Sequence, residues 1–124
     1  MATVLLLLCS NVFMTTAWYW HLRTSSSTIR GVWPLLTIIL ISWLIALPEY
    51  ALAVPANRLG ASSLGGTFSA WQLKILQEGI ALAVFVVFVL IYLRELPRWQ
   101  DLAGLALIAA GLLTALWRRA LPSA

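Results

Sequence analysis

Hydrophobic residues gather in four long runs that are separated by short polar segments. The runs cover approximately residues 3–21, 33–54, 70–93 and 99–117. A helix needs roughly 20 mostly apolar residues to cross the hydrocarbon core of a bilayer. The spacing therefore predicts an all-α integral membrane bundle of four transmembrane helices, which forms a single membrane domain over residues 1–124.

Trp and Tyr residues lie near the ends of these runs, where a ring can be half buried in lipid and its polar atom hydrated. One predicted side of the membrane holds Trp18, Tyr19, Trp20, Trp33, Tyr92 and Trp99. The opposite side holds Tyr50, Trp71 and Trp117. Trp43 falls in the middle of a span. This distribution supports the predicted ends of the helices.

The composition excludes an ordinary soluble domain. Of the 124 residues, 62% are hydrophobic and 10% are charged, against about 45–50% and 25% in soluble domains. The first run has no basic residue before it and no small-residue cleavage site, so we expect a retained helix rather than a cleaved signal. The predicted connections are a Ser/Thr segment from Arg23 to Arg30, a Gly/Ser loop from Leu59 to Thr67 and a tight turn from Arg94 to Arg98.

The basic residues do not indicate an orientation. The side that carries both termini holds Arg58, Lys74, Arg118 and Arg119, and the other side holds Arg23, Arg30, Arg94 and Arg98. The excess of Lys and Arg that marks the cytoplasmic side is therefore missing. Two interpretations stay open. Either both orientations are inserted and an antiparallel homodimer forms, or one orientation is fixed by features outside this count.

Two acidic residues fall inside predicted spans, where a charge costs upward of about 2.5 kcal/mol and needs a partner or a function. Glu49 lies late in the second run and Glu78 early in the third, on the same side of the membrane. Both are candidate proton- or cation-binding carboxylates, and Lys74, Arg58 and Asn11 are further pathway candidates. The alternative interpretation is structural. Lys74 lies one helical turn before Glu78, so these two charges can simply neutralise each other.

The second run contains two prolines that bear on its carboxylate. Pro48 and Pro55 lack the N–H groups that would bond to the carbonyls of Leu44 and Ala51, so the end of this helix should kink or loosen. Either the carbonyls freed near Pro48 are potential cation or hydrogen-bond acceptors beside Glu49, or Pro48 simply bends the helix. We expect Pro55 to end it. Asn11 lies mid-span in the first run, where we expect an interhelical hydrogen bond.

The fourth run is rich in small residues. Gly104 and Gly111 are seven positions apart on one helical face, and Gly111 and Ala115 form a small-xxx-small pair. Such faces let helix backbones approach closely in lipid. We therefore expect this helix to make an interhelical contact, either within the chain or across a dimer.

The sequence contains no constellation typical of an enzyme. It has no HExxH motif, no phosphate-cradling glycine loop and no Ser/His/Asp set. The lone Cys9 and the lone His21 have no second ligand at metal-site spacing, so we expect neither a metal nor a cofactor. The basic residues are scattered rather than clustered, which argues against nucleic acid as a partner.

Three segments carry a family resemblance: FMTTAWYWHLR from Phe13, PEYALAVPANRLG from Pro48, and FSAWQLKILQE from Phe68. Together they resemble an uncharacterised family of small four-helix proteins within the drug/metabolite transporter (DMT) superfamily. The resemblance implies a membrane protein related to transporters. The plan is also similar to that of the small multidrug resistance proteins. Those proteins carry a carboxylate in their first helix, whereas the polar group of this first run is Asn11.

The sequence thus favours a small-solute transporter-like protein that acts as a homodimer or larger homo-oligomer, proton- or cation-coupled through Glu49 or Glu78. We expect it in the bacterial inner membrane, with lipid and an unknown small solute as its partners. The alternative is a non-transporting helix bundle that binds a partner protein or lipid. In that case Glu49, Arg58, Lys74 and Glu78 would form a structural polar network.

Overall fold

The computed structural model describes residues 1–23 and 30–120 of the chain, with side chains as far as residue 117. The long helices are α1 (Ala2–Tyr19), α2 (Val32–Gly60), α3 (Ala70–Phe88) and α4 (Trp99–Ala120). Each helix, with its short extensions, is long and apolar enough to cross a membrane, and the described residues form no strand. The prediction of an all-α bundle of four membrane-spanning helices is confirmed. Most of the Ser/Thr segment predicted between Arg23 and Arg30 lies outside the described residues.

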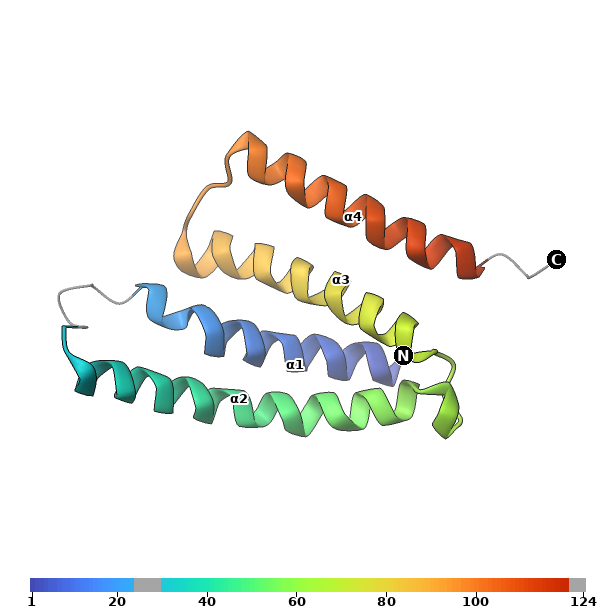
Figure 1. Cartoon of the computed structure of the whole chain (residues 1–124), viewed down its shortest axis with the longest axis horizontal. Coiled ribbons are helices and arrows are strands. Elements are labelled where there is room, and N and C mark those ends of the chain that lie inside the picture. Colours follow the sequence, from blue (N-terminus) through green and yellow to red (C-terminus); the bar gives the residue numbers. More distant parts are fainter. Residues whose placement is uncertain (24–29, 121–124) are drawn as a thin grey trace.

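Helix α1 is the centre of the bundle. It packs against α2 on one side and α3 on the other, and α4 packs mainly on α3 (Figure 1). The chain therefore forms a layer of three closely arranged helices with α4 added at the edge. The first turn of α1 and the last turns of α4 lie at the same end of the bundle (Figure 1).

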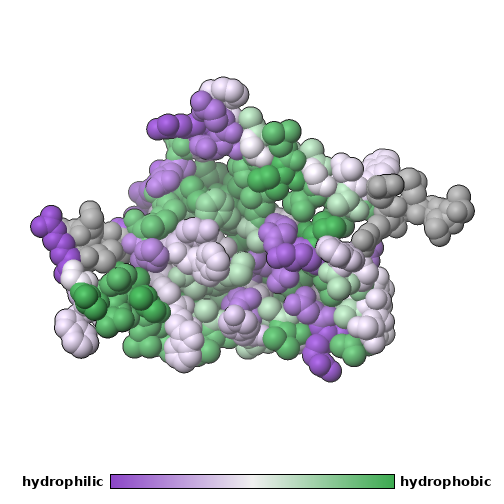
Figure 2. All heavy atoms as spheres, in the orientation of Figure 1, coloured by the Kyte–Doolittle hydropathy of each residue, from purple (hydrophilic) through white to green (hydrophobic). Residues whose placement is uncertain are grey.

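The buried face of α1 is small and polar rather than purely hydrophobic. Its buried residues recur at helical spacing: Thr3, Leu7, Ser10, Asn11, Thr15 and Ala17. Large hydrophobic side chains point mainly outward, because lipid tails solvate them as well as a protein core does. Figure 2 shows such hydrophobic surface over α3 and α4, with hydrophilic residues gathered at the turn between them. Interhelical packing therefore depends on close approach at α1.

Helix α2 does not end at the second proline, so the prediction for Pro55 is wrong. The helix continues through Pro48 and Pro55 to Gly60. A proline removes one hydrogen bond, and in a membrane helix neighbouring elements can compensate for that loss. Here Ala53, Ala56 and Gly60 are buried around and beyond Pro55, and this packing holds the last turns in place. Figure 1 shows α2 as one continuous ribbon with a shallow bend.

The connection between α2 and α3 is ordered by backbone hydrogen bonds. The Phe68 N–H donates to the Gly60 carbonyl at 2.8 Å, and the Ser62 N–H donates to the Phe68 carbonyl at 2.7 Å. Between them a short 3₁₀ turn (Ser62–Leu64) reverses the chain. Ser69 then caps α3 through a reciprocal pair of hydrogen bonds with Gln72. This loop fixes how the ends of α2 and α3 meet.

The other end of α3 widens into a π-helical segment (Val89–Leu93). Arg94 then adopts a left-handed conformation with φ 56° and ends the helix. Helix α4 starts after Pro97, and the Asp101 carboxylate accepts a hydrogen bond from the Arg98 N–H at 2.9 Å. An acidic group in the first turn stabilises a helix N-terminus. The predicted turn between Arg94 and Arg98 therefore separates two well-terminated helices.

Candidate functional site

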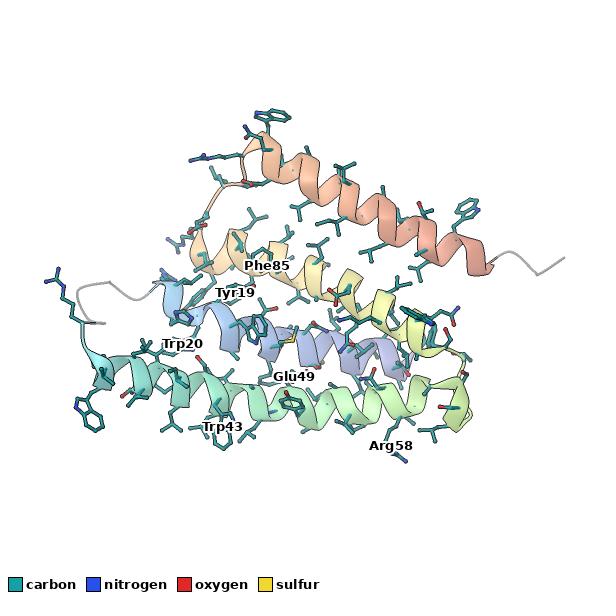
Figure 3. All side chains as sticks on the ribbon, viewed as in Figure 1. Tyr19, Trp20, Trp43, Glu49, Arg58 and Phe85 are labelled. Carbon is teal, nitrogen blue, oxygen red and sulfur yellow. The ribbon has the colours of Figure 1, made fainter. Side chains whose placement is uncertain are left out.

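The most enclosed carboxylate of the chain lies between α1 and α2. Glu49 is half-buried, and its Oε1 accepts a hydrogen bond from Ser10 Oγ at 3.3 Å. Figure 3 shows Glu49 in the interface between the two helices. Ser10 is fully buried on α1. Among the described side chains, no Lys or Arg lies within ion-pair distance of Glu49. The structure thus holds an acid against a hydroxyl, without a basic partner, inside the helix layer.

Asn11 follows Ser10 and is 1% exposed. Its Nδ2 donates to the Leu7 carbonyl at 2.8 Å, so the expected hydrogen bond between helices is instead made within α1. The carbonyl four residues earlier is the nearest acceptor that a short polar side chain in a helix can reach. Asn11 Oδ1 is buried and has no hydrogen-bond partner in the described part of the chain. The buried face of α1 thus presents a free acceptor one residue from the Ser10–Glu49 contact.

The other charged candidates lie elsewhere. Lys74 and Glu78 form an ion pair on α3, and their side chains are 66% and 53% exposed. Arg58 is exposed and points away from the bundle (Figure 3). Neither Glu78 nor Arg58 makes a described contact with Glu49. The structure therefore pairs Lys74 with Glu78, as the structural interpretation expected, and separates Glu49 from both Lys74 and Arg58.

At the opposite end of the bundle, the helices are joined by aromatic side chains that the sequence predicts only as interfacial. Trp20 Nε1 donates to Ser42 Oγ of α2 at 2.9 Å, and Tyr92 Oη donates to the Trp20 carbonyl at 3.4 Å. The rings of Tyr19 and Phe85 lie 5.0 Å apart, and Figure 3 shows them between α1 and α3. The spacing of aromatic residues near helix ends was the available signal, but it did not indicate which helices they join.

The two glycines of α4 do not make the close contact expected within the chain. A Cβ added to Gly104 or Gly111 would meet no atom within 4 Å. Helix α4 instead meets α3 through larger side chains such as Leu112, which lies near Gly79. An apolar cavity of about 610 Å³ separates the two helices near their connecting turn, with Phe85, Val89 and Gly104 in its lining. The expected interhelical contact exists, but not through the glycine face.

Four apolar spans, with a polar contact between α1 and α2, define a helical integral membrane protein. Residues 3–116 match a family described as "Putative member of DMT superfamily (DUF486)". The match covers nearly the whole chain, and the chain belongs to this family, in agreement with the resemblance of its three segments. No curated protein and no solved structure gives a significant match.

Proposed function

We propose that the chain is a subunit of a small-solute transporter in which Glu49 is the carboxylate that binds the coupling proton or cation. The observation that carries this proposal is the Ser10–Glu49 contact in the α1–α2 interface. An ionisable group inside a membrane is costly and is therefore a functional candidate by default. Membership of a family described within the DMT superfamily supports transport as the class of activity.

Glu49 is a better coupling candidate than Glu78. Glu78 is half exposed and is neutralised by Lys74. A carboxylate that is already paired with a cation gains less from binding a proton or a metal ion. Glu49 has a hydroxyl donor and, among the described side chains, no cation within ion-pair distance. Its charge is therefore available to be neutralised by a transported or coupled ion.

Ser10 and Asn11 extend the site along α1. Both are buried, and Asn11 Oδ1 has no hydrogen-bond partner among the described residues. An unpaired buried amide oxygen costs about 1–3 kcal/mol, so a hydrogen-bond donor that enters the interface would be stabilised there. We assign Ser10 and Asn11 to the solute or ion pathway. A four-helix chain offers little room to enclose that pathway, which is why the proposal includes a dimer.

The alternative is a non-transporting bundle stabilised by a network of Glu49, Arg58, Lys74 and Glu78. The outward direction of Arg58 and the separate Lys74–Glu78 pair give this network no support. We therefore favour the transporter, and we place it in the bacterial inner membrane as part of the same proposal.

The test compares two matched substitutions. The protein is reconstituted in liposomes, and uptake over a panel of small solutes is measured with and without a proton gradient. Glu49→Gln should abolish gradient-driven uptake, whereas Glu78→Gln makes the same chemical change on an exposed, ion-paired group and should leave uptake largely intact. Ser10→Ala should weaken coupling without abolishing it.

Folding is monitored in parallel through thermal unfolding of each variant in detergent. Loss of uptake in a folded Glu49→Gln protein supports the proposal. Uptake that depends on Glu78 and not on Glu49 would show that Glu78 is the coupling carboxylate, and would contradict the proposal. Wild-type protein that moves no solute in the panel, or uptake that neither substitution changes, contradicts the mechanism and favours the non-transporting alternative.

A further inference from the structure

The outward face of α2 carries a row of large side chains, which we call the α2 seam. Its members remain roughly half exposed or more, and their spacing alternates between four and three residues: Leu36, Leu40, Trp43, Leu47, Tyr50 and Val54. This alternation keeps all six on one side of the helix, as in helices that pack side by side with a small crossing angle. Apolar residues that face lipid need no partner. Two members of the seam, however, are not purely apolar.

Trp43 and Tyr50 carry polar atoms close to the middle of α2, because this helix continues to Gly60 and Tyr50 therefore does not lie at its end as predicted. They are 59% and 65% exposed, and Figure 3 shows Trp43 pointing away from the bundle. At about 1.5 Å per residue, both lie only some 5 Å from the midpoint of α2. Trp and Tyr normally occupy the interface, where water can bond to the indole N–H and the phenol.

Neither side chain makes a hydrogen bond within the described part of the chain. The hydrogen bonds of described Trp and Tyr side chains are instead those of Trp20, which donates to Ser42, and of Tyr92, which donates to the Trp20 carbonyl. Lipid tails offer neither donors nor acceptors, so an unpaired indole or hydroxyl in the bilayer core costs free energy. The polar atoms of Trp43 and Tyr50 therefore require a partner from outside this chain.

We propose that the α2 seam binds the α2 seam of a second copy of this chain that is inserted in the opposite orientation. Leu47 lies nearly midway between Trp43 and Tyr50 along the helix. In an antiparallel pair centred there, Leu47 meets its own counterpart and Leu40 comes level with the partner's Val54. Trp43 then lies within one residue, about 1.5 Å along the axis, of the level of the partner's Tyr50, twice in each dimer.

The antiparallel arrangement is the one that gives each Trp43 N–H an acceptor. An indole N–H can only donate, whereas a tyrosine hydroxyl can also accept. In an antiparallel pair, each Trp43 N–H can donate to the phenol oxygen of the partner's Tyr50. In a parallel pair about the same seam, Trp43 would face the partner's Trp43, two donors with no acceptor. The donor of Trp43 and the acceptor of Tyr50 thus specify both the partner, which is a second copy of the chain, and its antiparallel orientation.

The charges agree with this arrangement. Arg58 is exposed on the same side of α2 and comes level with the partner's Leu36, one turn from the partner's Trp33. A guanidinium over an indole ring is a favourable contact. The four basic residues counted on each side of the membrane also place no charge penalty on opposite insertion of two copies. The inference concerns assembly only, so it does not depend on transport through Glu49.

Disulfide formation between single cysteines tests the register directly in membranes. In a Cys9→Ala background, Leu47→Cys should cross-link to itself. Leu40→Cys and Val54→Cys should each cross-link weakly alone, but strongly to each other when two differently tagged copies are expressed together. Ile41→Cys, on the same helix but off the seam, is the matched control and should remain monomeric.

Three results would overturn the proposal. Cross-links of Leu40→Cys and Val54→Cys each to itself, with none between them, would show a parallel pair. Cross-links at Gly111→Cys on α4 with none along the seam would assign the interface to α4. No cross-link at any of these positions would leave the seam facing lipid. None of these readouts uses solute flux, so they fail or succeed separately from the proposed transport.

The hydrogen bond is tested by removing either polar group while keeping an aromatic side chain at each position. Trp43→Phe and Tyr50→Phe should each weaken dimerisation about threefold per bond, the average effect of an interhelical hydrogen bond in a membrane. The double substitution should add little to either single one, because both remove the same bond. Equal dimerisation of all four proteins would contradict the pairing of Trp43 with Tyr50.

Discussion

Gly66→Ala is the sharpest test of the loop that joins α2 to α3. A Cβ at this position would lie 2.3 Å from the carbonyl carbon and oxygen of Gly60 and 2.6 Å from the carbonyl oxygen of Leu59. These atoms belong to the backbone at the end of α2, so no side-chain rotation can make room. Either the loop or the last turn of α2 has to move.

The cost follows from what that movement disturbs. Overpacking a well-packed site costs typically about 1–3 kcal/mol. The same movement strains the hydrogen bonds of Gly66 to Ala61 and of Phe68 to Gly60, both 2.8 Å long. Each backbone hydrogen bond contributes about 1 kcal/mol. We therefore expect Gly66→Ala to lower the free energy of unfolding by about 2–4 kcal/mol, or Tm by roughly 10 °C.

Two other glycines serve as controls for the loss of glycine itself. Gly65 has φ 90° and open space around it, so Gly65→Ala should cost only the strain of a left-handed conformation, about 1 kcal/mol. Gly104 lies in α4 with nothing within 4 Å of an added Cβ, so Gly104→Ala should be neutral or slightly stabilising. Thermal unfolding in detergent, followed by tryptophan fluorescence, gives the order. A Gly66→Ala protein as stable as Gly65→Ala would refute the close contact.

Two further predictions concern packing around α1. Leu7 is fully buried, so Leu7→Ala should lower the free energy of unfolding by about 2–4 kcal/mol in the same assay. Leu107 is exposed on α4, so Leu107→Ala should change it by less than about 0.5 kcal/mol. Similar losses for both variants would contradict the central position of α1. Trp20 and Ser42 share one hydrogen bond, so Trp20→Phe and Ser42→Ala should each lower the free energy of unfolding by about 1 kcal/mol. Fully additive losses in the double variant would contradict that bond.

The four helices could be predicted from the sequence because the length of an apolar run is itself the physical requirement for crossing a bilayer. Local features were harder to predict. Pro55 indicated a helix end, but the helix continues because Ala56 and Gly60 pack beyond it. Asn11 indicated a contact between helices, yet its amide reaches the Leu7 carbonyl of its own helix. In both cases tertiary packing or a nearby acceptor outweighed the preference of the single residue.

The candidate site could be predicted only as a set of residues. A charge inside a span identifies Glu49 and Glu78 equally. What separates them is the rotation of each helix about its axis, which turns Glu49 toward Ser10 and leaves Glu78 exposed beside Lys74. That rotation depends on small side chains along α1, and a single sequence does not state which face of α2 meets them. Asn11 Oδ1 can likewise be identified as an unpaired acceptor among the described residues only once its neighbours are known.

The length of α2 has a consequence for the lipid around the protein. Its 29 residues make a rod about 43 Å long, which exceeds a hydrocarbon thickness of about 30 Å and reaches the headgroups on both sides. Shorter acyl chains would force this rod to tilt in order to relieve the mismatch. Tilting α2 against α1 would change how Glu49 meets Ser10. Bilayer thickness should therefore tune the chemistry of the interface without any substitution in the chain.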